Sequence, residues 1–321
     1  MADKQAVTWG QSIEYRDGFV LNPDQFYSPS FRISPFRTED ITDNLQLPRS
    51  ATAVEHLNHR FQGRRWRFTA CGKEGIALAL EALKLGPGDC VTILTTTGNL
   101  YVSGCVTREI EKVCQWSREM RKNTAVLFVI HEFGYPYRDL ADLRRFGLPI
   151  IEDACHSFLA DTQAIDMGRV GDFIVFSLPK IFPLQMGGIL SYDSRYEIET
   201  RVERGDGMED YLASVLSHYM PTLEDARRQR LSNHRYLAES FSALGCCPRF
   251  EMLSNDVPGV FMFKVPDPID LAEMKEYGWR HGVECSVFYG ERAFFVPVHQ
   301  RLRPADLDYF YTVFSSFILR H

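Results

Sequence analysis

The chain has little of what marks a membrane, secreted or nucleic-acid-binding protein. None of its apolar runs approaches the roughly 20 residues needed to span a bilayer. Its start, MADKQAVTWGQSIEYRDG, lacks the basic-then-apolar pattern of a signal peptide. The 36 basic residues are outnumbered by 42 acidic ones, and the net charge is -6, so no positive field attracts nucleic acid or an anionic membrane. We expect a cytoplasmic protein that binds neither.

The eight cysteines form no C-x-x-C pair and have no spacing typical of a metal site. Scattered cysteines of this kind are typical of reduced thiols inside a cell. The sequence therefore predicts free thiols and no bound metal. The cysteines stand at positions 71, 90, 105, 114, 155, 246, 247 and 285.

What the chain does contain is an alternation of apolar runs and helical patterns from about residue 51. The runs VTILTTT, AVLFVIHEF, LPIIEDA and FIVFSL read as strands, with helix-like stretches between most of them. Such an alternation indicates βαβ units, so the predicted fold class is α/β, a mostly parallel sheet sandwiched by helices.

Three regions are predicted, and 321 residues are enough for a large core and a smaller second domain. Residues 1–50 are rich in Asp, Pro, Ser, Arg and aromatics without a sustained period, and form an N-terminal arm. Residues 51–222 form the large α/β domain. Residues 223–321 form a long connecting helix followed by a small C-terminal α+β domain.

The first candidate site is the turn CGKEG (71–75), which contains Gly72 and Lys73 and opens an apolar helix. Free backbone N–H groups and the helix dipole favour a phosphate at such a position. The turn has the spacing of neither the P-loop nor the dinucleotide motif. Such a turn is more often only a strand-to-helix connection.

Two further candidates follow apolar strands. In IIEDACHS, Asp153 ends a strand and His156 comes shortly after, although an aspartate there also fits a helix cap and a histidine also fits the core. In FSLPKIFPLQMGGIL, Lys180 lies between a strand and a Gly-Gly pair, where it also fits a surface lysine. Ligands collect at the carboxyl ends of strands in open α/β sheets, so these groups are expected to meet.

Together the three groups are the components that pyridoxal 5'-phosphate (PLP) needs. A lysine binds the cofactor covalently, a carboxylate keeps the pyridine nitrogen protonated, and a glycine turn holds the phosphate. Their order along the chain also fits, so a PLP enzyme is the leading interpretation.

The chain resembles the DegT/DnrJ/EryC1/StrS family of sugar aminotransferases, which have the fold-type I architecture of PLP-dependent transferases. The matching stretches are ACGKEGIALALEALKLGPGDCV, VIHEFGYPYRDLADLRRFGLPIIEDACHS and GDFIVFSLPKIFPLQMGGIL, in the family's order and approximate spacing. A weaker match covers RRQRLSNHRYLAESFSALG and FFVPVHQRLRPADLDYF. The resemblance therefore spans most of the chain.

The resemblance implies roles for seven residues. Lys180 falls at the lysine that binds the cofactor, and Asp153 at the carboxylate that pairs with the pyridine nitrogen; these two are the predicted catalytic residues. The remaining predicted cofactor-binding residues are Gly72 and Lys73 in the place of the family's S-G-T turn, Ser177 as the phosphate-binding serine, His156 beside the cofactor, and Tyr101 as a substitute for the family's stacking aromatic ring.

Two departures from the family stand out. The segment TTTGNLYVSG offers only Tyr101 or Asn99 where an aromatic ring normally stacks on the cofactor. The family's Y-N-x-R-M segment, which completes the neighbouring subunit's site, has no clear counterpart in RVERGDGMEDYLASVLSHYMPTLEDA.

The implied function is a PLP-dependent aminotransferase. It would move an amino group from an amino acid, with glutamate as the expected donor, to a nucleotide-linked keto-sugar in amino-sugar or surface-polysaccharide biosynthesis. A homodimer is implied as well. Lysine at position 180, where the family's dehydratase branch has histidine, favours transamination over deoxygenation. Two alternatives stay open: a PLP enzyme for a non-nucleotide carbonyl substrate, and a cofactor-free binding protein on the same scaffold.

Overall fold

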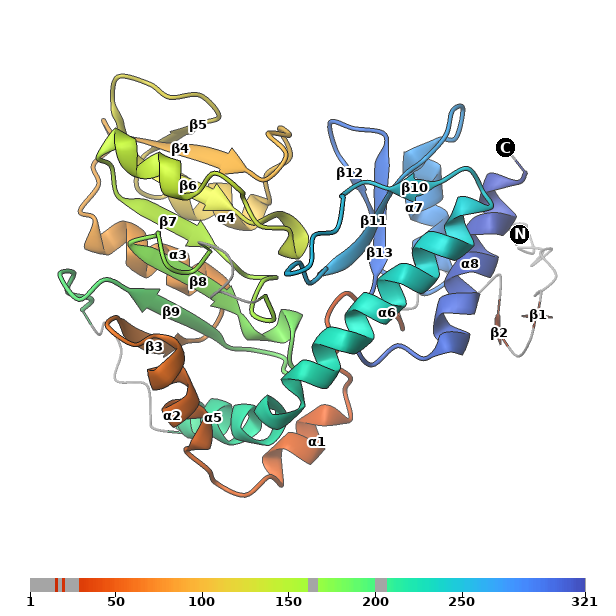
Figure 1. Cartoon of the computed structure of the whole chain (residues 1–321), viewed down its shortest axis with the longest axis horizontal. Helices are drawn as coiled ribbons and strands as arrows, with labels where there is room; N and C mark the ends of the chain where they lie inside the picture. The colour runs from red at the N-terminus through yellow and green to blue at the C-terminus, as the bar shows by residue number, and fades with distance from the viewer. Residues whose placement is uncertain (1–14, 17–18, 21–28, 161–166, 200–206, 321) are drawn as a thin grey trace, which may run out of the picture.

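The structure is a computed structural model that describes residues 29–160, 167–199 and 207–320, together with the two-residue strands β1 (Tyr15–Arg16) and β2 (Phe19–Val20). Two lobes are joined by one long helix (Figure 1). The predictions for the other residues of the N-terminal arm lie outside the described residues.

A seven-stranded sheet forms the large lobe, in the order β3-β9-β8-β7-β6-β4-β5. Strands β4 to β8 pair in parallel, and only β9 runs opposite to its neighbours β3 and β8. The predicted α/β fold with a mostly parallel sheet is confirmed. The strands are β3 (Arg65–Thr69), β4 (Cys90–Thr95), β5 (Gln115–Ser117), β6 (Thr124–Ile130), β7 (Ile150–Asp153), β8 (Phe173–Ser177) and β9 (Gly188–Tyr192).

Helices cover both faces of this sheet because the strands are apolar on both sides. In β8, Phe173 and Val175 belong to the cluster that includes residues of α3 (Gly72–Ala82) and α4 (Gly104–Glu111). The alternate residues Ile174 and Phe176 belong to the cluster that includes residues of α2 (Thr52–Arg60) and α5 (Gly207–Tyr219). Successive side chains of a strand point to opposite faces, so one apolar run serves both layers.

The small lobe is built on a four-stranded antiparallel sheet in the order β10-β11-β13-β12. Helix α6 (Leu223–Ser242) runs from the base of the large lobe to this sheet (Figure 1). Its buried Leu237 and Phe241 pack in the small-lobe core. The other elements are β10 (Cys247–Pro248), β11 (Val260–Lys264), α7 (Leu271–Arg280), β12 (Ser286–Phe288), β13 (Ala293–Pro297) and α8 (Pro304–Ile318).

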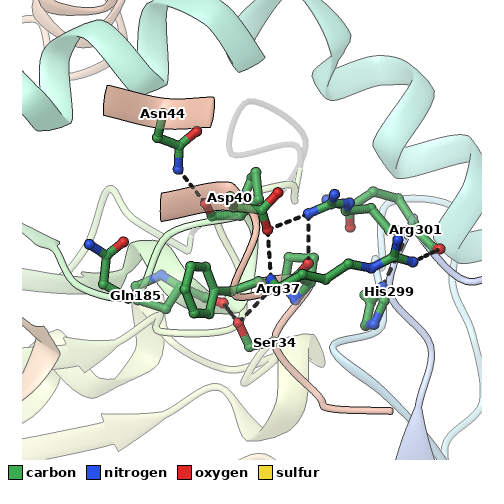
Figure 2. Close-up of polar contacts among 12 residues, drawn as sticks. Ser34, Arg37, Asp40, Asn44, Gln185, His299 and Arg301 are labelled. Atoms are coloured by element: carbon green, nitrogen blue, oxygen red, sulfur yellow. Dashed lines mark hydrogen bonds and ion pairs between the residues drawn. The ribbon is translucent and has the colours of Figure 1, made fainter. Parts of the chain in front are cut away.

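The segment that precedes the large lobe is held by a buried carboxylate. Asp40, at the start of α1 (Asp40–Leu45), accepts hydrogen bonds from the Arg37 backbone N–H and from the Arg301 guanidinium, both at 2.6 Å (Figure 2). Arg301 also donates to the carbonyl of Pro35 at 3.0 Å. Residues 35–40 are thereby fixed to the loop that precedes α8.

One local prediction differs in detail from the structure: residues Gly72 to Gly75 of the CGKEG turn already belong to the first turn of α3. Trp116 lies in β5, and the DLADLRRF stretch contains the 3-10 helix η2 (Ala141–Phe146). Short 3-10 turns also occur at η1 (Glu132–Gly134), η3 (Leu178–Lys180) and η4 (Met220–Thr222). Within the described residues, no helix has the length and apolar character needed to cross a membrane.

Candidate active site

A cavity of about 370 Å³ lies where the parallel strands of the large lobe end. The strands β6, β7 and β8 run in parallel, so their carboxyl ends meet at one edge of the sheet. All seven residues that the sequence predicts for the site line this cavity: Gly72, Lys73, Tyr101, Asp153, His156, Ser177 and Lys180. The structure thus brings them together, while their individual roles stay predictions.

The first turn of α3 faces this cavity with its N-terminal end. Cys71 is the N-cap residue and makes no side-chain capping hydrogen bond. The N–H groups of Gly72 and Lys73 have no acceptor one turn earlier in the helix, as at every helix start. A Cβ atom on Gly72 would lie 3.0 Å from the sulfur of Cys155 and 3.5 Å from Cβ of Ser177. Glycine therefore lets the helix start come close to β8, where an anion can contact both.

Lys180 ends the 3-10 turn η3, directly after β8. Its side chain is half-buried, and its ammonium group has no hydrogen bond or ion pair with any of the described residues. The segment then returns to the sheet through Gly187, whose φ of 108° lies in the left-handed region. Gly187 donates to the carbonyl of Ala70 at 2.7 Å. The lysine loop is thus anchored to the strand that leads into α3.

Backbone carbonyls of this lysine loop are held by side chains from three distant parts of the chain. The donors come from the N-terminal segment, from α6 and from the loop before α8. Figure 2 shows two of them, Ser34 and Asn44. Hydrogen bonds to carbonyls that no secondary structure satisfies remove the cost of burying them. They run from Ser34 to Pro179 at 2.6 Å, from Arg230 to Lys180 at 2.8 Å, from Gln300 to Ile181 at 2.7 Å and from Asn44 to Pro183 at 2.8 Å.

Asp153 is the last residue of β7, and its Oδ1 accepts a hydrogen bond from the Cys155 N–H at 3.0 Å. Asp153 also lines the cavity. Burial lowers the pKa of His156 well below its usual value, and the positive charges of Lys180 and Arg230 act in the same direction. His156 is therefore neutral at neutral pH. Its Nδ1 atom is buried without a hydrogen-bond partner among the described residues.

The loop after β4 supplies an aromatic ring to the cavity. The ring of Tyr101 stacks on Tyr289 of the small lobe, with centroids 6.0 Å apart and an interplanar angle of 19°. The other candidate, Asn99, is occupied: its side chain donates to Glu291 at 3.1 Å and accepts from the Tyr101 N–H at 3.1 Å. Of the two, Tyr101 is the one that lines the cavity.

Other lining residues were missed in the sequence. Phe133 and Glu132 come from η1, Phe295 from β13 and Ile33 from the N-terminal segment. The rings of Phe133 and Phe295 lie 4.7 Å apart, so the two lobes meet here. The one available signal was the charge of Glu132, two residues after the end of the apolar strand β6. No short sequence motif specifies which side chains of the two lobes come into contact.

The donor set fits PLP. A helix start without a side-chain cap can take a phosphate, a carboxylate ends β7, and an amine without a partner among the described residues lies in the same cavity. Among the described residues, no group of three His, Cys, Asp or Glu side chains is placed to hold a metal ion.

Comparison with known proteins agrees with this geometry. No family model and no curated protein matches the sequence. Solved structures do match the fold. The aminotransferase TlmJ from Streptoalloteichus hindustanus is 16% identical, with a TM-score of 0.70 over 90% of this chain and 99% of its own. The chain has an aminotransferase fold.

Two more structures extend the likeness. Spr1654 from Streptococcus pneumoniae, described as a sugar aminotransferase, is 14% identical with a TM-score of 0.71 over 92% of this chain and 98% of its own. A DegT DnrJ EryC1 StrS aminotransferase from Brucella abortus is 15% identical with a TM-score of 0.65 over 87% and 93%. Structures of Spr1654 include PLP and PMP forms. The fold implied by the sequence resemblance, fold-type I, is confirmed.

Proposed function

We propose that this protein is a PLP-dependent aminotransferase that moves an amino group from an amino acid, glutamate, to a nucleotide-linked keto-sugar. The observation that supports it is the meeting of Lys180, Asp153, Ser177 and the first turn of α3 around one cavity at the carboxyl edge of the sheet. The fold shared with sugar aminotransferases points the same way. Amino-sugar or surface-polysaccharide synthesis in the cytoplasm is the corresponding biological role.

Each residue has a stated task in this proposal. When bound, PLP serves as an electron sink that makes the Cα proton of an amino acid acidic. Ser177 and the N–H groups of Gly72 and Lys73 hold the phosphate, and the carboxylate of Asp153 holds a proton on the pyridine nitrogen. The Nζ of Lys180 binds the cofactor covalently. As a free amine, this Nζ would take up the Cα proton and return it, as general base and acid.

The carbonyl contacts of the lysine loop support this task. Arg230 and Gln300 hold the backbone at Lys180 and Ile181, so the freed amine stays within reach of the same position. His156, being neutral, can share a hydrogen bond with the cofactor without adding charge.

The test uses the purified full chain with added PLP. Borohydride should fix the cofactor on Lys180, as shown by the mass of the modified peptide, and glutamate added before borohydride should remove the colour. Lys180→Ala should bind no cofactor covalently. A protein that stays colourless with PLP, or that carries the label on another lysine, contradicts the proposal. Colour that glutamate leaves unchanged contradicts only the choice of donor.

A second candidate is a PLP enzyme acting on a carbonyl substrate without a nucleotide. It is favoured by the similarity of the fold to 3-amino-5-hydroxybenzoic acid synthase, which is 13% identical with a TM-score of 0.65 over 92% of this chain and all of its own. Turnover of simple keto compounds and none of nucleotide-linked keto-sugars would favour this candidate.

The proposal includes a homodimer, since fold-type I enzymes usually complete their sites at a subunit boundary. Light scattering of the holoprotein checks it: a mass of twice 36.9 kDa is expected. A monomer that still transfers amino groups contradicts this part alone.

A further inference from the structure

The loop that brings Tyr101 to the cavity has no regular secondary structure. Residues 96–103 connect β4 to α4, and none of them belongs to a helix or a strand. Such a loop leaves backbone N–H and C=O groups that no ladder or helix satisfies. Tyr101 nevertheless lines the cavity and stacks on Tyr289. Holding this ring at one position therefore needs contacts from other elements, because a free loop would lose conformational entropy when it is ordered.

The first of these contacts comes from Arg118, directly after β5. Its Nη1 donates a hydrogen bond to the carbonyl of Ile93 at 2.7 Å. Its Nη2 donates to the hydroxyl of Thr95 at 2.9 Å and to the carbonyl of Asn99 at 2.5 Å. The planar guanidinium thus joins the end of β4 to the middle of the loop. Arg118 does not line the cavity, so its effect on a bound molecule passes through the loop.

The second contact comes from a carboxylate. Oε2 of Glu132 accepts hydrogen bonds from the backbone N–H and the hydroxyl of Thr97, both at 2.8 Å. Within the loop, the Thr97 hydroxyl accepts from the Asn99 N–H at 3.2 Å, and Oδ1 of Asn99 accepts from the Tyr101 N–H at 3.1 Å. Hydrogen bonds therefore run without a break from Glu132 to the backbone of Tyr101.

The two charged groups bind backbone groups of opposite polarity. The guanidinium of Arg118 binds carbonyls, and the carboxylate of Glu132 binds an N–H group. Burial lowers the pKa of Arg118, and Glu132 acts against this change. Burial raises the pKa of Glu132, and Arg118 acts against that change. Each charge thus stabilises the other, and hydrogen bonds to charged groups are stronger than those between neutral groups.

The same loop meets the small lobe at Asn99. Its Nδ2 donates to Glu291 at 3.1 Å. A Cβ on Gly290 would lie 2.5 Å from Oδ1 of Asn99, so glycine is needed for this close approach. Tyr289, the neighbouring residue of the small lobe, stacks on Tyr101. A displaced loop would therefore move the Tyr101 ring and also separate it from its support.

We propose that Arg118 is a positioning residue that fixes residues 95–101 so that the ring of Tyr101 stays against the bound cofactor. The inference rests on the proposed aminotransferase function, because only a bound cofactor gives the ring this contact. Arg118 acts through the loop and does not touch the cofactor. A lysine at this position would keep the positive charge but would lack the planar fork that spans the three acceptors.

The informative variant is therefore Arg118→Lys, and the first measurement needs no cofactor. Hydrogen exchange of the peptide that covers residues 95–101 should be faster in the variant than in the wild type, because the loop opens more often when its carbonyls are released. The matched control is Arg121→Lys, which changes an exposed arginine three residues further along the chain. Its exchange should equal that of the wild type.

The second measurement separates positioning from a general loosening of the fold. Fluorescence titration gives the PLP affinity of Arg118→Lys, Tyr101→Ala and the double variant. Arg118→Lys alone should weaken PLP binding about three- to tenfold, up to the strength of one aromatic contact. In the Tyr101→Ala protein, the same substitution should change the affinity less than about twofold, because the ring that it positions is gone. A loosened fold would weaken binding equally in both backgrounds.

Several results would overturn the inference and leave the aminotransferase function intact, as long as borohydride still traps PLP on Lys180. These are unchanged hydrogen exchange in Arg118→Lys, unchanged PLP affinity in that variant, and equal weakening in the two backgrounds. Unchanged PLP affinity in Tyr101→Ala has the same meaning, since Arg118 then has no cofactor contact to position. A wild-type protein that traps no cofactor refutes the aminotransferase function, and the role of Arg118 falls with it.

Discussion

The two sides of the cavity are built in different ways. The phosphate wall consists of Gly72, Lys73, Ser177 and Lys180, and comes from the start of α3 and the end of β8. The Glu132 wall consists of Tyr101, Glu132, Phe133 and Phe295, and comes from two loops and the small lobe. The first depends on helix and strand ends, which short motifs specify. The second depends on side chains that only the tertiary fold brings together.

The largest expected effect comes from Asp153, which lines the cavity together with both walls. Asp153→Asn keeps an oxygen for the Cys155 N–H and removes the negative charge that holds a proton on the pyridine nitrogen. The rate of amino transfer should fall about 10²- to 10⁴-fold, the size typical of a lost proton-handling group. The measurement is kcat with glutamate as donor.

Asp43→Asn is the matched control, since it removes an exposed carboxyl on α1 that does not line the cavity. It should change kcat less than twofold. A loss below tenfold in Asp153→Asn would mean that this carboxylate does not act on the cofactor, and the phosphate wall would then bind PLP without help from β7.

The difference between the walls also explains what the sequence could predict. The alternation of apolar runs predicted the parallel sheet, because a strand buried on both faces must be apolar throughout. Seven site residues were predicted, since each follows a strand or starts a helix and matches the order of a family's motifs. Their common cavity agrees with that prediction. The strand β13 and the contact of Phe295 with Phe133 were not predicted, because nothing local specifies which side chains meet across two lobes.

A second prediction concerns the packing under the phosphate wall. A Cβ on Gly188 would lie 2.5 Å from the hydroxyl of Thr69, 2.8 Å from the Phe176 carbonyl and 2.9 Å from the backbone of Cys71. Two of these neighbours are backbone atoms that cannot turn away. Gly188→Ala should lower the free energy of unfolding by about 1–3 kcal/mol. Urea unfolding of the cofactor-free protein measures it.

The control for this substitution is Gly88→Ala, because a Cβ there has no neighbour within 4 Å and the residue is exposed. Its effect should stay within about 0.5 kcal/mol. Equal effects of the two substitutions would show that the start of α3 is not tightly packed on the sheet, and would remove the difference between the walls.

A third prediction concerns acid and the support of the Glu132 wall. His234 of α6 lies 3.3 Å from the hydroxyl of Tyr135, three residues after Glu132. Burial lowers the pKa of His234 from 6.5 to about 4. Between these values the unfolded chain binds the additional proton, so stability is lost as the pH falls from 6.5 towards 4. At pH 5 the loss from this group should be about 2 kcal/mol relative to pH 7.

Urea unfolding of the wild type and of two variants at pH 7 and pH 5 checks this. The carboxylates are the same in all three proteins, so their contribution to the loss of stability cancels when the proteins are compared. His234→Gln keeps a polar partner for Tyr135 and should lose less stability on acidification than the wild type. His59→Gln, which removes an exposed histidine of α2, should behave as the wild type. Identical pH dependence of all three proteins would show that His234 does not carry the acid sensitivity.

The smallest effect is expected from the hydroxyl of Tyr101. It has no hydrogen bond with any of the described residues, whereas the ring stacks on Tyr289 and lies beside Phe288 at 5.6 Å. Tyr101→Phe keeps the ring, so both the free energy of unfolding and the affinity for PLP should stay nearly unchanged, within about 0.5 kcal/mol. Tyr101→Ala removes the ring and should weaken PLP binding about tenfold, the strength of one aromatic contact.

Fluorescence titration with PLP measures both variants and decides which wall holds the cofactor. If Tyr101→Ala binds PLP as the wild type does, the phosphate wall holds the cofactor alone, and the Glu132 wall serves only the substrate. If Tyr101→Phe already binds it more weakly, the hydroxyl itself contacts the cofactor. Tyr101 would then bind the cofactor through its hydroxyl group, and not through the stacking of its ring that the family resemblance predicts for this position.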